Sequence, residues 1–207
     1  MHWYHWLALA ALAICLGSLL FHTIRLVRLG KPKDYSSPTG NPSSAIPYSF
    51  TGAMSPTKKE SAFLYLPTYT AGIFYHLGTF LSIFLFVMLL FQFQFNGWIA
   101  WGIFGFLMIS GLSGLGILIK RMMKPQMRSL SNPDDYISNF LVTLFQFISA
   151  FTIINPTLGP VYFITVSILL FYIPLSKLKH TIYFFAARYH LGYFFGWRNV
   201  WPPKQTH

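Results

Sequence analysis

Histidine is the residue type with which this chain could do chemistry. The sequence holds seven histidines, namely His2, His5, His22, His76, His180, His190 and His207. Four of them, His22, His76, His180 and His190, lie in or beside long apolar segments, where an ionisable side chain is a candidate functional residue. Imidazole binds haem iron and other metals, and it exchanges a proton near neutral pH. Their positions therefore indicate cofactor binding or proton transfer.

Other residue types exclude several alternatives. The acidic residues are Asp34, Glu60, Asp134 and Asp135, and all lie outside the apolar segments. A carboxylate-bridged metal centre or an intramembrane carboxylate relay therefore has no obvious members. The single cysteine, Cys15, lies inside an apolar segment, so the chain has no disulfide framework and no cysteine-ligated iron–sulfur cluster of its own. No nucleophile–base–acid set typical of a hydrolase is visible.

Five apolar segments must position the histidines. They run over about 5–28, 70–93, 98–119, 137–155 and 159–180. Each is close to the roughly 20 residues that a membrane-spanning helix needs. Apolar residues make up 54% of the chain and charged residues 9%, against about 25% charged in soluble domains. We therefore expect an all-α integral membrane protein, a bundle of five transmembrane helices forming a single membrane domain over 1–207.

The basic residues predict how the bundle is oriented. All fifteen Lys and Arg residues fall on one side, in about 29–69, 120–136 and 181–207 or in the helix ends beside them, and the turns at 92–97 and 155–160 hold none. The positive-inside rule then places the N-terminus outside and the C-terminus in the cytoplasm, in the cytoplasmic (inner) membrane. The formal net charge is +11, and the basic residues that give it border the spans. This placement indicates contact with anionic lipid and not with nucleic acid.

Two segments lie outside the predicted spans. Residues 30–67 are rich in Pro, Ser and Gly, which favours an irregular cytoplasmic strap loop over a helix. Residues 181–207 form a cytoplasmic C-terminal tail that we expect to continue span five. The tail ends in aromatic residues mixed with Arg198, which suit either a lipid-interface belt or a docking anchor.

His76 and His180 are the candidate haem ligands. In the predicted topology both lie near the cytoplasmic ends of spans, at similar depth on separate helices, as a bis-histidine haem requires. Gly78 beside His76 would give a porphyrin clearance, and Pro174 would kink span five ahead of His180. The alternative is that both are hydrogen-bonded structural histidines near helix ends.

Cations and one further histidine complete the candidate site. Lys120, Arg121, Lys177 and Lys179 are possible contacts for haem propionates, which are anionic. His22 is a possible member of a quinone site, because quinone chemistry needs a proton donor or acceptor. An ordinary helix-end histidine is the alternative there.

Three motifs resemble a known family. The run Leu118–Arg128, leading into Asn132–Tyr136, resembles the loop after span three in the gamma subunit of respiratory nitrate reductase. It also resembles the related membrane cytochrome b subunits of heterodisulfide-reductase-like and sulfite-reduction-associated complexes. Phe74-Tyr75-His76-Leu77-Gly78 is similar to that family's second-helix ligand motif, and Ile173–His180 to its fifth-helix motif. The resemblance implies a five-helix cytochrome b with His76 and His180 as axial ligands.

The chain departs from that family where a second haem would bind. The family's diheme members carry a further ligand on each of the two helices, and the matching positions are Phe86 and Tyr162. Neither is a histidine, so we expect one haem b. His22 and His190 could supply a second site. His190, however, is about 1000° of helical rotation past His180 and would point to a different face.

These features predict a haem b membrane subunit of a respiratory oxidoreductase complex. It would pass electrons between membrane quinone, menaquinone or ubiquinone, and a cytoplasmic iron–sulfur partner subunit, and it would not be catalytic alone. The alternative is a haem-free anchor or assembly subunit of such a complex. A transporter is the weakest option, since neither an inverted repeat nor a deep charge is visible in the spans.

Overall fold

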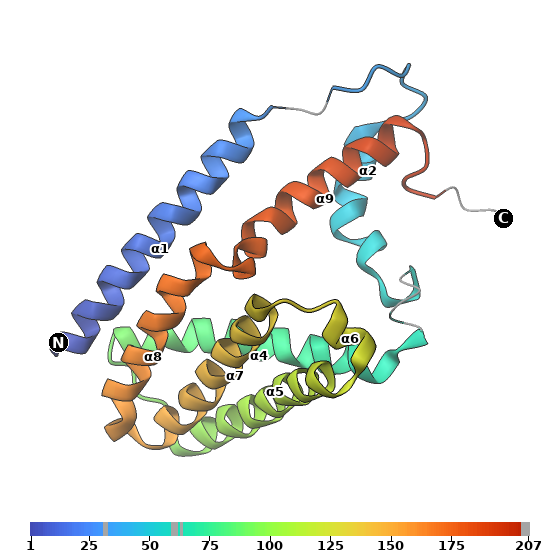
Figure 1. The fold of residues 1–207 in the computed structure, drawn as a ribbon. Helices are drawn as coiled ribbons and strands as arrows, with labels where there is room; N and C mark the ends of the chain where they lie inside the picture. Colours follow the sequence, from blue (N-terminus) through green and yellow to red (C-terminus); the bar gives the residue numbers. More distant parts are fainter. Residues whose placement is uncertain (31–32, 59–61, 63, 204–207) are drawn as a thin grey trace. The chain divides into compact units, whose positions relative to one another are not determined.

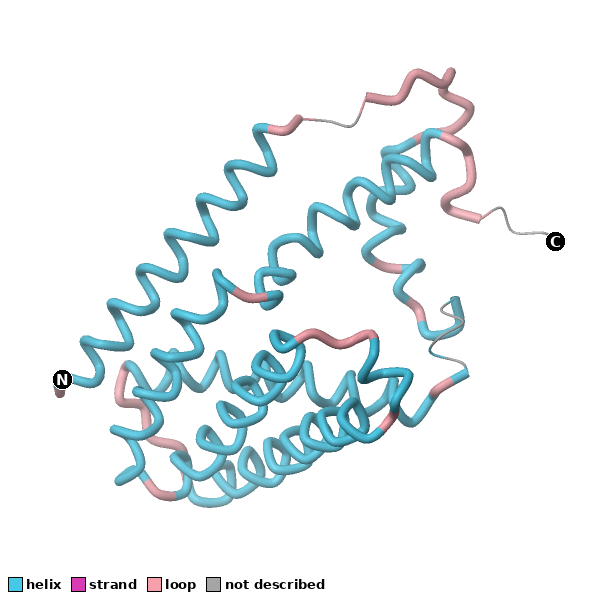
Figure 2. The backbone as a smooth tube through the Cα atoms, viewed as in Figure 1, coloured by secondary structure: helices cyan, strands magenta, loops and turns pink. Residues whose placement is uncertain are grey.

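The computed structural model describes residues 1–30, 33–58, 62 and 64–203, and throughout these ranges the chain is helix and loop without a strand (Figures 1 and 2). Three of the basic residues, Lys31, Lys59 and Lys204, and the acidic Glu60 lie outside the described residues, as does His207. Five helical segments are long and apolar enough to cross a membrane: Trp3–Arg28, Leu66–Leu90, Gly97–Met123, Pro133–Ile154 and Pro156–Leu175. The structure confirms the all-helical class and the expected number of helical segments that could span a membrane.

The chain divides into two compact units. Unit 1 comprises Met1–Ser18 and Pro67–Leu178, and unit 2 comprises Leu19–Leu66 and Lys179–His207. The sequence had indicated a single membrane domain. The division arises because the segment expected to be an irregular strap and the C-terminal tail pack against each other.

Unit 1 is a helical bundle. It contains the first part of α1 (Trp3–Arg28), then α4 (Leu66–Leu90), α5 (Gly97–Met123), the short α6 (Pro125–Ser129), α7 (Pro133–Ile154) and α8 (Gly159–Tyr172). Helix α7 packs against both α5 and α8. The buried core brings together Ala8, Phe86, Phe145 and Tyr162, so α1, α4, α7 and α8 all contribute to it. Many large apolar side chains of these helices are exposed, as expected for helices that face lipid.

Hydrogen bonds between neighbouring residues stabilise the start of α7. Asn132 accepts a hydrogen bond from the Asp135 N–H at 3.0 Å, and the Asp135 carboxylate accepts one from the Asn132 N–H at 2.9 Å. Pro133 occupies the first turn, where its missing N–H costs no hydrogen bond. This capping box and the two aspartates in the first turn suit the positive end of the helix dipole.

Unit 2 replaces the expected irregular strap with ordered helix. Helix α2 (Pro42–Phe50) is followed by two 3₁₀ turns, η1 (Gly52–Met54) and η2 (Pro56–Lys58), and α2 packs against α9 (His180–Trp197). The Asn41 side chain caps α2 by accepting a hydrogen bond from the Ser43 N–H at 2.9 Å, with Pro42 in the first turn. The composition was misleading, because this Asn–Pro pair starts a helix.

Two glycines let α2 approach α9 closely. A Cβ atom on Gly192 would lie 2.6 Å from Ile46 Cα, and one on Gly196 would lie 2.6 Å from Ala45 Cβ. The Ser49 hydroxyl reinforces the pair by donating to the Arg188 carbonyl at 2.7 Å. Small residues four apart on α9 therefore bring the backbones together, as in close pairs of membrane helices.

Span five ends earlier than the sequence indicated. Helix α8 stops at Tyr172, two 3₁₀ turns follow as η4 (Ile173–Leu175) and η5 (Lys177–Lys179), and α9 begins at His180. The tail is therefore a separate helix and not a continuation of span five. Pro174 explains the break, because it has no N–H for the helical ladder. His180 is the first residue of α9, outside the apolar span that ends at Leu175.

Candidate functional site

His76 lies on the exposed side of α4 in unit 1. Ile73, Leu77 and Phe80, which share its side of the helix, are exposed as well. The adjacent Tyr75 is buried. His76 is thus the polar residue of an apolar stripe, on the helix face where a membrane-embedded cofactor or lipid would be met.

The opposite side of α4 faces a buried polar cluster that the sequence did not reveal. The fully buried Gln146 of α7 donates to the Tyr75 carbonyl at 2.9 Å and to Thr79 Oγ1 at 2.8 Å. Ser110 Oγ of α5 lies 2.7 Å from Gln146 Oε1. Thr143 donates to the Tyr75 hydroxyl at 3.1 Å. These contacts join α4, α5 and α7 and satisfy polar groups that lipid could not.

Gly78 belongs to that packing interface. A Cβ atom at this position would overlap Ser110 Oγ and Cβ and lie 3.1 Å from Gln146 Oε1. The expected role of Gly78, clearance for a porphyrin, therefore needs correction. The missing side chain admits α5 to α4, because the space beside Gly78 is already filled by Ser110.

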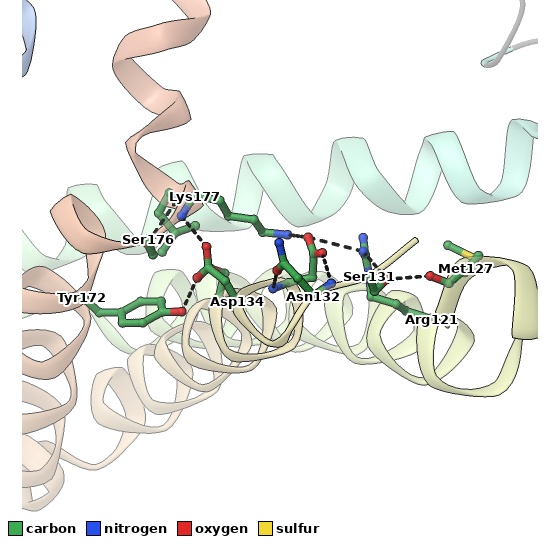
Figure 3. A network of polar contacts seen from close by, with 11 residues as sticks. Arg121, Met127, Ser131, Asn132, Asp134, Tyr172, Ser176 and Lys177 are labelled. Atoms are coloured by element: carbon green, nitrogen blue, oxygen red, sulfur yellow. Dashed lines mark hydrogen bonds and ion pairs between the residues drawn. The ribbon is translucent and has the colours of Figure 1, made fainter. Parts of the chain in front are cut away.

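A second polar network ties the start of α7 to the end of α8 (Figure 3). The Asp134 carboxylate accepts hydrogen bonds from the Lys177 N–H at 2.7 Å, from Ser138 Oγ at 3.0 Å and from the Tyr172 hydroxyl. It therefore holds the segment just after the break at Pro174. The sequence did show Asp134, but nothing in it indicated Tyr172 and Lys177 as its partners, because both lie far along the chain.

Asp135 pairs with two of the cations proposed as propionate contacts. It accepts a hydrogen bond from Lys177 Nζ, and Arg121 Nη1 lies 3.5 Å from its Oδ1. Arg121 also donates to Ser131 Oγ at 3.0 Å. Both cations are thus engaged by an acid of the chain itself.

The other two candidate cations have different settings. Lys120 Nζ donates to Thr68 Oγ1. Lys179 is half-buried just before α9 in unit 2, and no ion pair connects it to the part of the chain that the structure describes. Among the four predicted cations, Lys120 and Lys179 make no ion pair with an acid in that part of the chain.

The second proposed ligand, His180, is exposed at the start of α9 and belongs to unit 2, whereas His76 belongs to unit 1. His22, the proposed quinone residue, also lies in unit 2. Its Nδ1 is 3.4 Å from the Tyr183 hydroxyl of α9, and the two rings are 6.3 Å apart. The chain thus brings an imidazole and a phenol together, a pairing that the sequence did not indicate.

Aromatic residues occupy the two positions at which the resembling family has its second pair of haem ligands. Phe86 is 5% exposed and Tyr162 is fully buried, both in the core of unit 1. Phe163 contacts both, with ring centroids 6.3 Å from Phe86 and 5.1 Å from Tyr162. This region is a filled hydrophobic core. His190 lies elsewhere, exposed on α9, where it lines an open groove.

Neither the known protein families nor the curated proteins and solved structures contain a match to this chain.

Proposed function

We propose that this protein is the haem b membrane subunit of a respiratory oxidoreductase complex, in which His76 and His180 would hold one haem. The observation that carries the proposal is the position of His76, an imidazole on the exposed apolar stripe of a spanning helix. An ionisable residue placed there without a function would be costly. A haem held by these two imidazoles would supply one-electron transfer and no oxygen chemistry.

The chain's other residues have supporting roles. Lys120 and Lys179 are the cations best placed for a propionate, because Arg121 and Lys177 already contact Asp135. Aromatic packing around Phe86 and Tyr162 supports a single haem, since it fills the positions of the second ligand pair. His22 and Tyr183 would exchange protons with a membrane quinone, menaquinone or ubiquinone.

The proposed partner is an iron–sulfur subunit in the cytoplasm. The chain has one cysteine, Cys15, buried inside α1, so it holds no cluster of its own. The one-sided distribution of Lys and Arg supports a cytoplasmic-membrane location with the N-terminus outside. Electrons would then pass between the quinone in the bilayer and the partner at the basic face.

A haem-free anchor or assembly subunit is the second candidate, and two contacts favour it. Ser110 fills the space beside Gly78 and leaves no room for a porphyrin on that side of α4. Arg121 and Lys177 both contact Asp135, so an acid of the chain already engages the two cations. An anchor needs only the five spans and a docking face.

One experiment separates the two. The full chain is purified from membranes of cells that make haem, and its reduced-minus-oxidised spectrum is recorded. A b-type band, with one haem per chain in a pyridine-haemochrome assay, supports the cytochrome. Protein without the band is an anchor, and two haems per chain would contradict the single site and direct attention to His22 and His190.

A further inference from the structure

Unit 2 contains an open groove beside α9. It has a volume of about 810 Å³, within the range of small-molecule binding sites. One wall is the segment before α2, and the other is the second half of α9. The lining residues are Lys33, Asp34, Tyr35, Ser36, Ala187, His190, Leu191, Tyr193, Phe194 and Arg198.

The groove is fixed by contacts between its two walls. Arg198 Nη1 lies 2.6 Å from Asp34 Oδ2, and the Arg198 guanidinium stacks on Phe194 with its carbon 3.7 Å from the ring centroid. The Trp197 indole N–H donates to the Ser36 carbonyl at 2.9 Å. Hydrogen bonds from Ser36, together with Arg198, hold the pKa of Asp34 below its ordinary value, so this carboxylate is ionised at neutral pH.

The lining combines an apolar surface with positive charge. Ala187, Leu191 and Phe194 supply carbon, and Tyr193 adds an aromatic face. Asp34 balances Arg198, which leaves Lys33 as the surplus cation of the lining, to which His190 contributes an imidazole. The whole unit is basic in the same way, with ten Lys and Arg residues in its sequence and two acids.

We propose that this groove binds an anionic phospholipid. Its phosphate would lie against Lys33 and the outer edge of Arg198, and its acyl chain would follow Ala187, Leu191 and Phe194. Basic residues that follow membrane spans on the cytoplasmic side attract acidic lipid head groups in this way. A quinone fits the charge less well, because its head group is neutral and gains nothing from Lys33. Inorganic phosphate fits the apolar lining less well. The proposal does not depend on a haem.

Native mass spectrometry of the full chain in detergent tests it. Dioctanoyl phosphatidylglycerol, dioctanoyl phosphatidylcholine or inorganic phosphate is added at equal concentration, and the retained adduct is measured. We expect phosphatidylglycerol to be retained and to raise the melting temperature more than phosphatidylcholine does. Equal effects of the two lipids would overturn the proposal. A matching rise with phosphate alone would identify a plain anion site and would overturn the lipid assignment.

Matched variants locate the site. Lys33→Gln leaves the Asp34–Arg198 pair intact and should lower phosphatidylglycerol retention about fivefold, the effect of one cation near an anionic head group. Ala187→Phe keeps the charge but fills the groove, and it should also lower retention. Lys58→Gln removes an equal charge from η2, outside the groove, and should leave retention unchanged. If Lys58→Gln acted as strongly as Lys33→Gln, binding would be to general positive charge and the groove would have no special role.

Discussion

Adjacent residues of α4 occupy opposite environments. Tyr75 is buried and its hydroxyl donates to the Asn139 carbonyl at 2.9 Å, whereas His76 is exposed among apolar side chains. The 100° step between successive helical residues produces this contrast. Gly78 returns to the buried side, where Ser110 lies against it. One short motif thus carries a structural tyrosine, a structural glycine and a histidine on the exposed face of the helix.

The proposed ligands give the first prediction. We expect His76→Ala or His180→Ala to abolish the b-type band, because each removes an axial bond to the iron. His190→Ala should leave the band intact, since that residue lines the groove beside α9. The measurement is the reduced-minus-oxidised spectrum of each purified variant. Loss of the band in His190→Ala alone would show that the fifth-helix motif has been aligned incorrectly.

The packing role of Gly78 gives a second prediction, for which Gly72 on the same helix provides the control. Gly78→Ala should destabilise the protein by about 1–3 kcal/mol, the usual cost of overpacking, because its Cβ meets Ser110. Gly72→Ala meets no atom within 4 Å and should be neutral or slightly stabilising. Thermal unfolding in detergent measures both. Equal melting temperatures for the two variants would contradict the close approach of α5 to α4.

At the scale of elements, helix ends and breaks determine the arrangement. Asn132 and Pro133 start α7, Asn41 and Pro42 start α2, and Pro174 ends the apolar run of α8. Asp134 then holds the segment after the break through the Lys177 N–H. The helix that follows, α9, carries eight aromatic residues and is held to α2 by small residues at the contact.

The contact between α2 and α9 gives the third prediction. Gly192→Val should separate the helices, because even a Cβ atom would lie 2.6 Å from Ile46 Cα. We expect the backbone amides of α2 to exchange hydrogen about 5- to 150-fold faster, as an overpacking cost of about 1–3 kcal/mol implies. Thr181→Val, on an exposed position of α9 outside the groove, is the control and should leave exchange unchanged. Unchanged exchange in both variants would mean that α2 is ordered without α9.

The whole molecule is a membrane protein with strongly asymmetric charge. Five helical segments are long and apolar enough to span a bilayer, and the turns between the second and third and between the fourth and fifth carry no Lys or Arg. Unit 2 gathers most of the basic residues, ten of fifteen. Such an asymmetry orients a bundle during insertion.

Orientation is therefore the fourth prediction. Reporter fusions after Asn96 and Asn155 should report the outside of the cell, and a fusion after Gln126 should report the cytoplasm, because the basic residues are retained on the cytoplasmic side. A phosphatase that is active only outside and a fluorescent protein that folds only inside provide complementary readouts. Reversed readouts at these three positions would contradict the proposed partner face as well as the topology.

Local features of the sequence were sufficient to predict the five spans but not to predict where span five ends. Span five was expected to reach residue 180 because the apolar run continues, yet the helix breaks at Pro174 and His180 starts α9. The strap was expected to be irregular because Pro, Ser and Gly are frequent in it. The Asn41–Pro42 pair could have predicted the start of α2. The four-residue spacing of Gly192 and Gly196 could have predicted that α9 packs closely against another helix.

By itself the sequence determined the helical class, the five spans and the uneven charge, because length, hydropathy and charge are properties of contiguous residues. It also supplied the candidate histidines. The tertiary structure alone decided which faces those residues occupy. It placed Ser110 and Gln146 against Gly78, Asp135 between Arg121 and Lys177, and Tyr183 beside His22. Such pairings join residues far apart in the chain, and no local pattern encodes them because they depend on how the helices pack.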